Sequence, residues 1–319
     1  MEIISDLAEE LNVSIIELIN QMQQAPKKYK VYSIKKRSGG SRIIAQPTAF
    51  VKMVQKGLCT SFLSQFKYSN SAMAYVKERS PISNANVHVG AKLILKLDFE
   101  NFFPSIKAAH FIEFLERNKV TLESLEIDFL IRYLFRKVKG SYELSIGAPS
   151  SPLISNVMMY DFDLEIEEAL KDSLINYTRY ADDLTFSANS FEELNEAKLF
   201  VEAVILSKRY SFLKINEDKS KIIGRGRSQR VTGITLTHDS KISIGKSLRK
   251  RIRGMLHLYN QKKLKKNDIP YLHGIISHMR SVEPDYFKKL IDVYGAELFS
   301  RLARQSFMIS KETKMKLME

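Results

Sequence analysis

Apolar residues recur every three or four positions over much of this chain, which is the spacing of one buried face of a helix. This spacing predicts helices in seven segments: residues 7–24 (with a break near 12–14), 49–66, 107–118, 122–138, 152–171, 191–209 and 246 onward. The last quarter of the chain is therefore expected to be helical throughout.

Shorter apolar or alternating runs, bounded by turn residues, predict strands between these helices. Residues 29–36 and 42–45 flank the sequence Ser38-Gly39-Gly40-Ser41, which is a strong hairpin signal. Further strands are predicted at 93–97, 176–187 (two strands about a tight turn), 213–215, 220–223, 230–237 and 241–244. Because strands mix with helices until a helical unit closes the chain, we expect an α+β body with a helical appendage.

The formal charge narrows the choice of partner. The chain carries 50 Lys and Arg against 36 Asp and Glu, a net charge of +14, and this excess favours a polyanion. Residues 245–319 hold 17 of the basic residues and 7 of the acidic ones. Two tight clusters in this segment predict a phosphate-binding face rather than a merely solvated surface: Arg249, Lys250, Arg251, Arg253 and Lys262, Lys263, Lys265, Lys266.

Cysteine usage and hydropathy exclude several classes of protein. Cys59 is the sole cysteine, so neither an internal disulfide nor a cysteine metal cluster is possible. The first residues are acidic where a signal peptide would be basic, and no stretch approaches the roughly 20 apolar residues that span a bilayer. We therefore expect a cytoplasmic protein with no membrane partner, whose polyanionic partner is a nucleic acid.

Three aspartates at predicted strand ends form the candidate chemical centre. Asp182 and Asp183 are adjacent in a tight turn, where their charges repel each other, and Asp98 ends the buried run at 93–97. Alone, these features are typical of a solvated turn and of a strand-end cap. Together they predict a three-carboxylate cluster, whose hard oxygen ligands hold Mg²⁺ and support two-metal nucleotidyl transfer.

The order and spacing of four motifs resemble those of reverse transcriptases across residues 35–237. These motifs are LD at 97–98 with FFPS at 102–105 (the first palm motif), GAPSSP at 147–152 followed by Asn156 (template and nucleotide contacts), YADD at 180–183 (the catalytic hairpin) and NEDKS at 216–220 (a later palm motif). The YADD sequence alone is weak evidence, whereas the four motifs in this order are strong evidence.

Two further sequences narrow the resemblance to retron reverse transcriptases. Residues 84–88 match the NAxxH box that these enzymes carry before the first aspartate, and residues 231–233 match their VTG box. The chain length is also similar, whereas group II intron enzymes normally continue into a maturase region. One departure is Ile146, where the family usually has Gln, so a polar contact near the templating base pair is missing or replaced.

The resemblance implies a right-hand polymerase with fingers, palm and a helical basic thumb. Residues 1–88 and 107–145 would form the fingers, and the palm would comprise residues 89–106 and 146–237. The remaining segment, residues 238–319, would form the thumb and an RNA-binding region.

The resemblance also implies roles at the catalytic centre. Asp98 and Asp182 would bridge two Mg²⁺ ions, with Asp183 supporting them and the Phe99 carbonyl completing one metal shell. Lys219 would protonate or neutralise the leaving pyrophosphate, as general acid catalysis requires. An ordinary surface lysine is an equally good interpretation of Lys219 taken alone.

A second group of residues is implied to bind the incoming dNTP. Arg42 would hold its triphosphate, although a solvated hairpin arginine is the simpler interpretation. Phe102 or Phe103 would pack under the sugar and exclude a 2′-hydroxyl, while the other packs in the core, and the sequence does not decide between them. Gly147 and Ala148 belong to the nucleotide-contacting motif.

A third group is implied to contact RNA. Asn84 and His88 either contact RNA or brace an ordered loop, and the sequence leaves both interpretations open. The remaining members are the VTG box and the first basic cluster of the C-terminal segment: Val231, Thr232, Gly233, Arg249, Lys250, Arg251 and Arg253.

The function implied is that of an RNA-directed DNA polymerase that copies part of a cognate noncoding RNA into single-stranded DNA (msDNA). Synthesis in this family starts from an RNA 2′-hydroxyl and serves antiphage defence beside an effector, here expected on a separate chain. Two alternatives are another bacterial reverse transcriptase, of the group II intron or diversity-generating type, and a non-catalytic RNA-binding scaffold. The three intact aspartates argue against the scaffold.

Overall fold

The computed structural model describes residues 1–35 and 39–316, and it divides the chain into two compact units. The first unit comprises Met1–Arg79 and Leu93–Ile222. The second comprises Ser80–Lys92 and Ile223–Glu319. Within the described part of the chain, no helix is long and apolar enough to cross a membrane.

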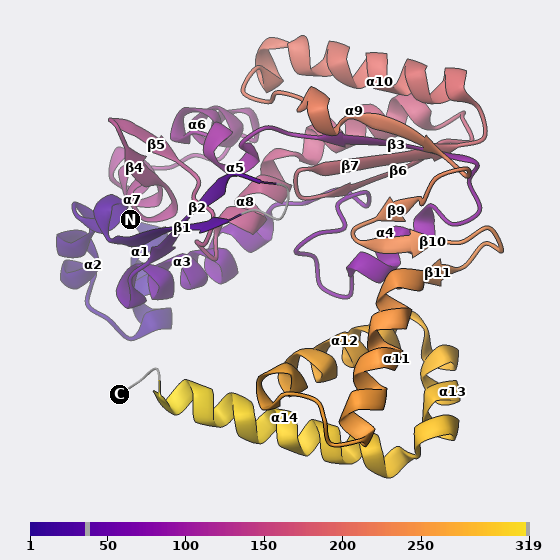
Figure 1. The fold of residues 1–319 in the computed structure, drawn as a ribbon. Coiled ribbons are helices and arrows are strands. Elements are labelled where there is room, and N and C mark those ends of the chain that lie inside the picture. Colours follow the sequence, from indigo (N-terminus) through magenta and orange to yellow (C-terminus); the bar gives the residue numbers. More distant parts are fainter. Residues whose placement is uncertain (36–38, 317–319) are drawn as a thin grey trace. The chain divides into compact units, whose positions relative to one another are not determined.

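A four-stranded sheet, in the order β6-β7-β3-β8, is the centre of the first unit, and β7 is antiparallel to both β6 and β3. Its strands are β3 (Leu93–Asp98), β6 (Asn176–Tyr180), β7 (Asp183–Ala188) and β8 (Lys221–Gly224). Three helices belong to this part: α8 (Ser151–Met158), α9 (Tyr160–Leu170) and α10 (Phe191–Leu206). Helices α9 and α10 lie along one face of the sheet (Figure 1). The apolar positions of β3 and β7 are buried against them.

The rest of the first unit is mainly helical. Its elements are α1 (Glu2–Leu11), α2 (Ile15–Met22), α3 (Ala49–Ser61), α5 (Phe102–Ser105), α6 (Ala108–Arg117), α7 (Ser124–Leu134) and two antiparallel hairpins, β1 (Tyr29–Lys35) with β2 (Ser41–Pro47) and β4 (Arg136–Val138) with β5 (Ser141–Glu143). One continuous hydrophobic core joins these elements to the sheet.

The second unit combines one short helix, one small sheet and a helical bundle. Helix α4 (Pro81–Val87) packs on a sheet of order β11-β10-β9. The other elements are β9 (Arg230–Val231), β10 (Ile234–Leu236), β11 (Ile242–Ser243), α11 (Lys246–Asn260), α12 (Ile269–Val282), α13 (Pro284–Tyr294) and α14 (Ala296–Lys316). Apolar side chains on the inner faces of the four C-terminal helices, among them Ile252, Leu272 and Leu302, are fully buried.

The predicted mixture of helices and strands is confirmed as an α+β fold, and so is the predicted break after the first helix. Asn12 adopts a left-handed conformation (φ 51°) at the end of α1, and Ser14 caps α2 by accepting from the Glu17 amide. The hairpin predicted about residues 38–41 is also present, although its Lys36 and Ser38 lie outside the described residues.

The strand expected over 213–215 is reduced to an isolated bridge between Ile215 and Phe99, and the helix expected over 152–171 is divided into α8 and α9. Two further predicted elements were wrong for a local physical reason. The helix expected over 122–138 ends at Leu134, and Arg136–Val138 forms strand β4 because Lys139 and Gly140 take left-handed turn conformations. The strand expected over 230–237 is interrupted, since Thr232 and Gly233 have φ values of 48° and 84° and reverse the chain into a hairpin.

Candidate active site

The sheet register brings the predicted aspartates together. Asp98 is the last residue of β3 and lies directly opposite Asp183, the first residue of β7. Asp182 sits in the two-residue turn between β6 and β7, where Ala181 takes a left-handed conformation (φ 58°). The Phe99 amide donates to the Asp182 carbonyl at 3.0 Å and ties the end of β3 to this turn.

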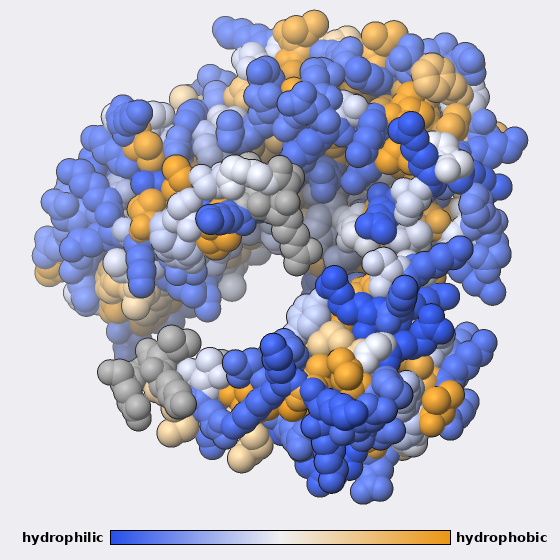
Figure 2. Space-filling model, in the orientation of Figure 1, coloured by the Kyte–Doolittle hydropathy of each residue, from blue (hydrophilic) through white to orange (hydrophobic). Residues whose placement is uncertain are grey.

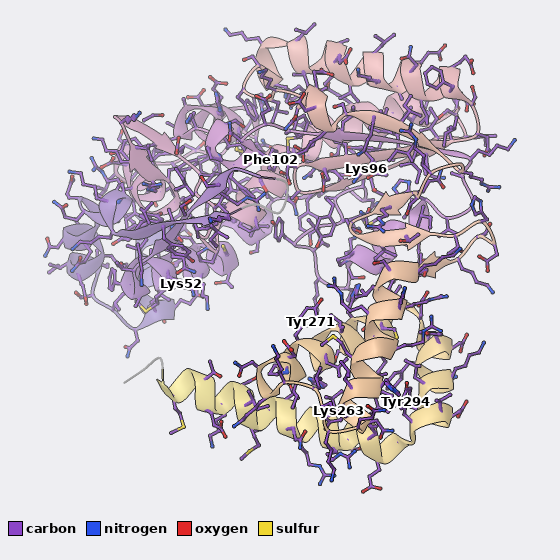
Figure 3. All side chains as sticks on the ribbon, in the orientation of Figure 1. Lys52, Lys96, Phe102, Lys263, Tyr271 and Tyr294 are labelled. Carbon is purple, nitrogen blue, oxygen red and sulfur yellow. The ribbon has the colours of Figure 1, made fainter. Side chains whose placement is uncertain are left out.

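The pKa values of two aspartates record the crowding of negative charge. Burial, reinforced by Asp98, raises the pKa of Asp182. Burial also raises the pKa of Asp183 to about 6, with added repulsion from Asp182 and Asp98, while Lys96 opposes the shift. Lys96 is labelled on β3 in Figure 3. A folded chain maintains such a strained cluster where a cation offsets the repulsion.

Lys219 reaches the same cluster from a later part of the chain. It ends the short 3₁₀ helix η4 (Glu217–Lys219), and its Nζ lies 2.6 Å from Asp98 Oδ1. The Asn216 amide donates to the Asp98 carbonyl at 2.7 Å and fixes where this helix begins. The structure thus brings the predicted lysine to the predicted aspartate, 121 residues away.

The donors at this centre fit a divalent cation. Three carboxylates gather where the inner strand β3 ends and β7 begins, two of them with raised pKa values, and carboxylate oxygens are the ligands that Mg²⁺ prefers. Across residues 1–35 and 39–316, no three His, Cys, Asp or Glu side chains already stand in a metal-binding arrangement. The positive charge beside Asp98 is supplied here by Lys219.

A cavity of about 320 Å³ is lined by the predicted nucleotide-contacting motif. Phe103, Gly147 and Ala148 all line it. Its other side chains include Lys52 of α3 and Tyr75, neither of which was predicted from the sequence. Lys52 is labelled in Figure 3, and its helix carries no motif that could have marked it.

The two candidate aromatic residues differ in their surroundings. Phe102 is 2% exposed and stacks on Phe99, with ring centroids 5.8 Å apart, so it belongs to the core. Phe103 is half-buried and lines the cavity, facing Tyr75 at 6.4 Å between ring centroids. Both sit in the one-turn helix α5, and the structure separates their surroundings where the sequence does not.

Glycine is required at position 147 by both conformation and space. Its φ is +119°, and a Cβ there would lie 3.0 Å from the Ala45 carbonyl oxygen. The Ala45 amide donates to the Ile146 carbonyl at 2.8 Å, so strand β2 is tied directly to the cavity wall. Ile146 itself lines the cavity. The expectation that its apolar side chain removes or replaces a polar contact near the templating base pair stays a prediction.

Arg42 lies on β2, and its charge acts on Asp182 in the turn between β6 and β7. It pairs with Ile34 across the β1–β2 hairpin and is exposed. Its guanidinium counteracts the raised pKa of both Asp182 and Tyr75. A cation in that position is suited to an anionic ligand close to the aspartates, which agrees with the predicted contact to a triphosphate.

A fully buried polar network is built on β6, the strand that leads into the turn containing Asp182. Arg179, two residues before Ala181 on β6, forms an ion pair with Asp163 at 2.6 Å, and both side chains are 0% exposed. Arg179 also donates to the Asn156 side chain at 3.1 Å. Arg179 and Asp163 were missed by the sequence analysis, because their partnership joins two elements that carry no shared motif.

The residues of the NAxxH and VTG boxes lie together in the second unit. Asn84 and His88 are both 0% exposed, and burial lowers the pKa of His88 to about 4. Thr232 donates from Oγ1 to the Pro81 carbonyl at 2.9 Å, which fixes the VTG turn against α4. Val231 is buried and Gly233 exposed. RNA contact by these residues stays a prediction.

The four predicted RNA-binding cations of α11 are not equivalent. Arg249 is ion-paired with the buried Glu283 and stacks over the Tyr286 ring at 4.8 Å, so it serves the fold. Lys250, Arg251 and Arg253 are exposed, with Arg251 donating to the Tyr271 hydroxyl at 3.0 Å. The surface of these C-terminal helices is largely hydrophilic in Figure 2.

Comparison with known proteins agrees with this geometry. A family model described as "Reverse transcriptase (RNA-dependent DNA polymerase)" matches residues 34–237. The Escherichia coli Retron Ec83 reverse transcriptase is 35% identical over 282 residues, which cover 87% of this chain and 90% of that protein. The Escherichia coli Retron Ec73 reverse transcriptase is 32% identical over 290 residues, covering 88% and 91%. A solved telomerase structure from Candida albicans is similar at a TM-score of 0.49 and 12% identity, covering 91% of this chain and 58% of that one.

The matched family, together with the aspartates where β3 ends and β7 begins, defines an RNA-directed DNA polymerase with an α+β fold. Relatives at 35% and 32% identity, matched over most of their length, specify the type. The chain belongs to the retron reverse transcriptases.

Proposed function

We propose that this chain copies part of a cognate noncoding RNA into msDNA, starting from a 2′-hydroxyl of that same RNA. The proposal is supported most by the joint presence of the catalytic turn, the NAxxH box and the VTG box in a chain similar to retron enzymes over most of its length. We place this activity in the cytoplasm and in antiphage defence, beside an effector on a separate chain.

Two Mg²⁺ ions are proposed as the cofactor, held by Asp98, Asp182, Asp183 and the Phe99 carbonyl. When bound, the ions supply a polarised nucleophile and stabilise charge on the leaving pyrophosphate. Asp98 and Asp182 would be the main ligands of the ions, with Asp183, opposite Asp98 in the sheet, supporting them. Lys219 would donate a proton to the departing pyrophosphate, and its Nζ, 2.6 Å from Asp98 Oδ1, supports this role.

The cavity lined by Phe103, Gly147 and Ala148 is proposed as the dNTP site. Phe103 is the sugar gate, because its half-buried ring faces this cavity while Phe102 is enclosed in the core. Arg42 would bind the triphosphate, in keeping with its proximity to Asp182. Lys52 provides a second cation on the cavity wall.

Selection of the RNA is assigned to the second unit. This unit contains a cavity of about 1350 Å³, larger than a single small ligand requires. Its cationic lining comprises Arg225, Arg227, Arg230, Lys241, Lys246, Arg249 and Lys289. Such a surface fits the phosphates of a folded RNA, which proteins recognise mainly by shape and backbone.

We propose the following subdomains for the chain. Residues 1–88 and 107–145 form the fingers, residues 89–106 and 146–237 form the palm, and residues 238–319 form the thumb.

The direct test is synthesis on the RNA encoded beside the gene. Purified protein, that RNA, Mg²⁺ and labelled dNTPs should give a DNA joined to the RNA, and RNase digestion should leave a short remnant attached by a 2′ linkage. A synthetic RNA with a 2′-deoxy sugar at the branch position is the matched control and should give no product. DNA made equally from both RNAs would contradict initiation at the 2′-hydroxyl.

A further inference from the structure

Tyr75 has a backbone conformation that bulky residues rarely adopt. Its φ is +61°, in the left-handed region, which costs an aromatic residue about 1–2 kcal/mol. Its side chain is 56% exposed, so the conformation is not needed to bury the ring. Strain of this kind persists where the surrounding structure imposes it, and it concentrates at functional sites.

The segment before Tyr75 is tied to the palm by several hydrogen bonds. The Met73 amide donates to the Arg179 carbonyl at 2.7 Å, and the Arg179 amide donates to the Ser71 carbonyl at 2.7 Å. Asn156 donates from Nδ2 to the Ala74 carbonyl at 2.8 Å. The palm therefore determines the backbone immediately before the strained residue.

The side chains behind these bonds cannot shift easily. Asn156 is 1% exposed and accepts from Arg179, whose guanidinium is ion-paired with Asp163 in a site closed to solvent. Loss of one partner would leave a buried charge uncompensated, so the network is rigid. A rigid network that ends at the Ala74 carbonyl holds Tyr75 against the cavity wall.

The ring of Tyr75 faces the part of the cavity assigned to the sugar. Its centroid is 6.4 Å from that of Phe103, the proposed gate at C2′, and both residues line the same space. The hydroxyl lies within the electrostatic field of Asp182 and of Arg42, since both alter the Tyr75 pKa. The phenol hydroxyl would then be a hydrogen-bond donor close to C3′ of the nucleotide, which is the carbon next to C2′.

We propose that Tyr75 binds the incoming nucleotide, its ring packing against the sugar opposite Phe103 and its hydroxyl donating a hydrogen bond to the 3′-hydroxyl. This proposal rests on the assignment of the cavity as the dNTP site. Phe103 would then exclude a 2′-hydroxyl, and Tyr75 would recognise the 3′-hydroxyl required for the next round of extension. The fixed backbone of Tyr75 gives this contact the precision that selection between nucleotides needs.

Single-nucleotide incorporation kinetics with dNTP and 2′,3′-dideoxy-NTP test the proposal. Tyr75→Phe removes only the hydroxyl and should reduce kcat/KM for the dNTP by about tenfold, the effect of one hydrogen bond. Incorporation of the dideoxy substrate, which lacks the 3′-hydroxyl, should stay unchanged, so the dNTP preference should fall by the same factor. Tyr68→Phe, an exposed tyrosine in the same segment, is the matched control and should leave both substrates unaffected.

Three outcomes overturn the proposal in distinguishable ways. Unchanged kcat/KM for both dNTP and dideoxy-NTP in Tyr75→Phe, in an enzyme where Phe103→Ala admits ribonucleotides, would remove Tyr75 from the site and leave the cavity assignment standing. Unchanged sugar selection in both variants would refute the cavity assignment itself. An equal decrease for dNTP and dideoxy-NTP would assign the hydroxyl to another role and overturn the 3′-hydroxyl proposal.

Discussion

At the scale of single residues, the proposed catalytic centre follows from where β3 ends and β7 begins. Asp98 and Asp183 are opposed because β3 and β7 are antiparallel and in register, and the turn between β6 and β7 adds Asp182. Each aspartate lies next to a strand that is buried, so the carboxylates are held rigidly. The raised pKa of Asp183, to about 6, is a consequence of that placement.

The sugar gate is the first prediction at this scale. Phe103→Ala should raise ribonucleotide incorporation relative to dNTP by about 10- to 100-fold, because the variant no longer has a steric barrier worth about 1–3 kcal/mol. Phe102→Ala should leave this ratio unchanged and instead lower the free energy of unfolding by about 3–5 kcal/mol, since it opens a cavity in the core. Incorporation kinetics and denaturant unfolding measure the two effects. An altered sugar preference in Phe102→Ala alone would reverse the assignment.

At the scale of elements, the features predicted correctly from the sequence are those encoded by residues that are close together along the chain. The strand end at Asp98 and the tight turn at Asp182 are encoded by the local sequence, and the family motifs predicted a shared metal-binding role for these aspartates. Choosing between Phe102 and Phe103 required the orientation of the one-turn helix α5, which periodicity does not give. Tyr75 and Lys52 reach the cavity only through contacts between distant segments, and no local pattern marks them.

The position of α4 was likewise not predictable from the sequence. Its first residue, Pro81, lies 151 residues before Thr232, yet both belong to the second unit and are joined by the bond from the Thr232 hydroxyl to the Pro81 carbonyl. The buried Asn84 and His88 are enclosed by that packing. The NAxxH and VTG boxes therefore form one structural feature, and their shared presence in the chain has a physical explanation.

The pH dependence of stability tests the burial of His88. Burial lowers its folded pKa to about 4, below the ordinary 6.5, so unfolding takes up a proton between these values. The resulting stability is fully present above pH 6.5 and is lost as pH falls toward 4, by about 2 kcal/mol at pH 5. His88→Gln should therefore show a smaller fall in melting temperature from pH 7 to pH 5 than the unmodified protein.

The matched control for this test is His278→Gln, which alters an exposed histidine of α12. It should keep the pH dependence of the unmodified protein. Identical pH dependence in all three proteins would mean that His88 is not held neutral in the folded state.

At the scale of the whole molecule, the excess of positive charge is concentrated where the sequence analysis located it. Residues 245–319 carry much of the net charge of +14, and the structure adds the cations that line the large cavity of the same unit. Arg249 is committed to Glu283, whereas Lys250, Arg251 and Arg253 present their charge to solvent. The exposed three are therefore the better test of RNA binding.

Reversing Lys250, Arg251 and Arg253 to Glu should weaken binding of the cognate RNA and flatten its salt dependence. Removing one cation from a phosphate lowers the slope of log K against log salt by about 0.7–0.9, so a fall of about two to three is expected for the three residues. Extension of an annealed primer on a generic template should persist. Affinities for cognate and scrambled RNA across a salt series measure the effect.

A control with the same change in net charge reverses Lys27, Lys171 and Lys208, three exposed lysines of the first unit, and should alter the slope less. An equal weakening for cognate and scrambled RNA would make the segment a nonspecific clamp. Unchanged affinity for both would remove it from the RNA-binding surface.

We propose that Asp98 at the end of β3, with Asp182 and Asp183 at the β6–β7 turn, performs metal-dependent DNA synthesis on RNA. Asp182→Asn removes one negative ligand while keeping the size of the side chain, and primer extension in Mg²⁺ on an RNA template is the measurement. Synthesis should fall about a thousandfold or more, because transition-state stabilisation worth several kcal/mol is lost, while affinity for RNA stays within about twofold. Substantial DNA synthesis by Asp182→Asn under these conditions would contradict the claim.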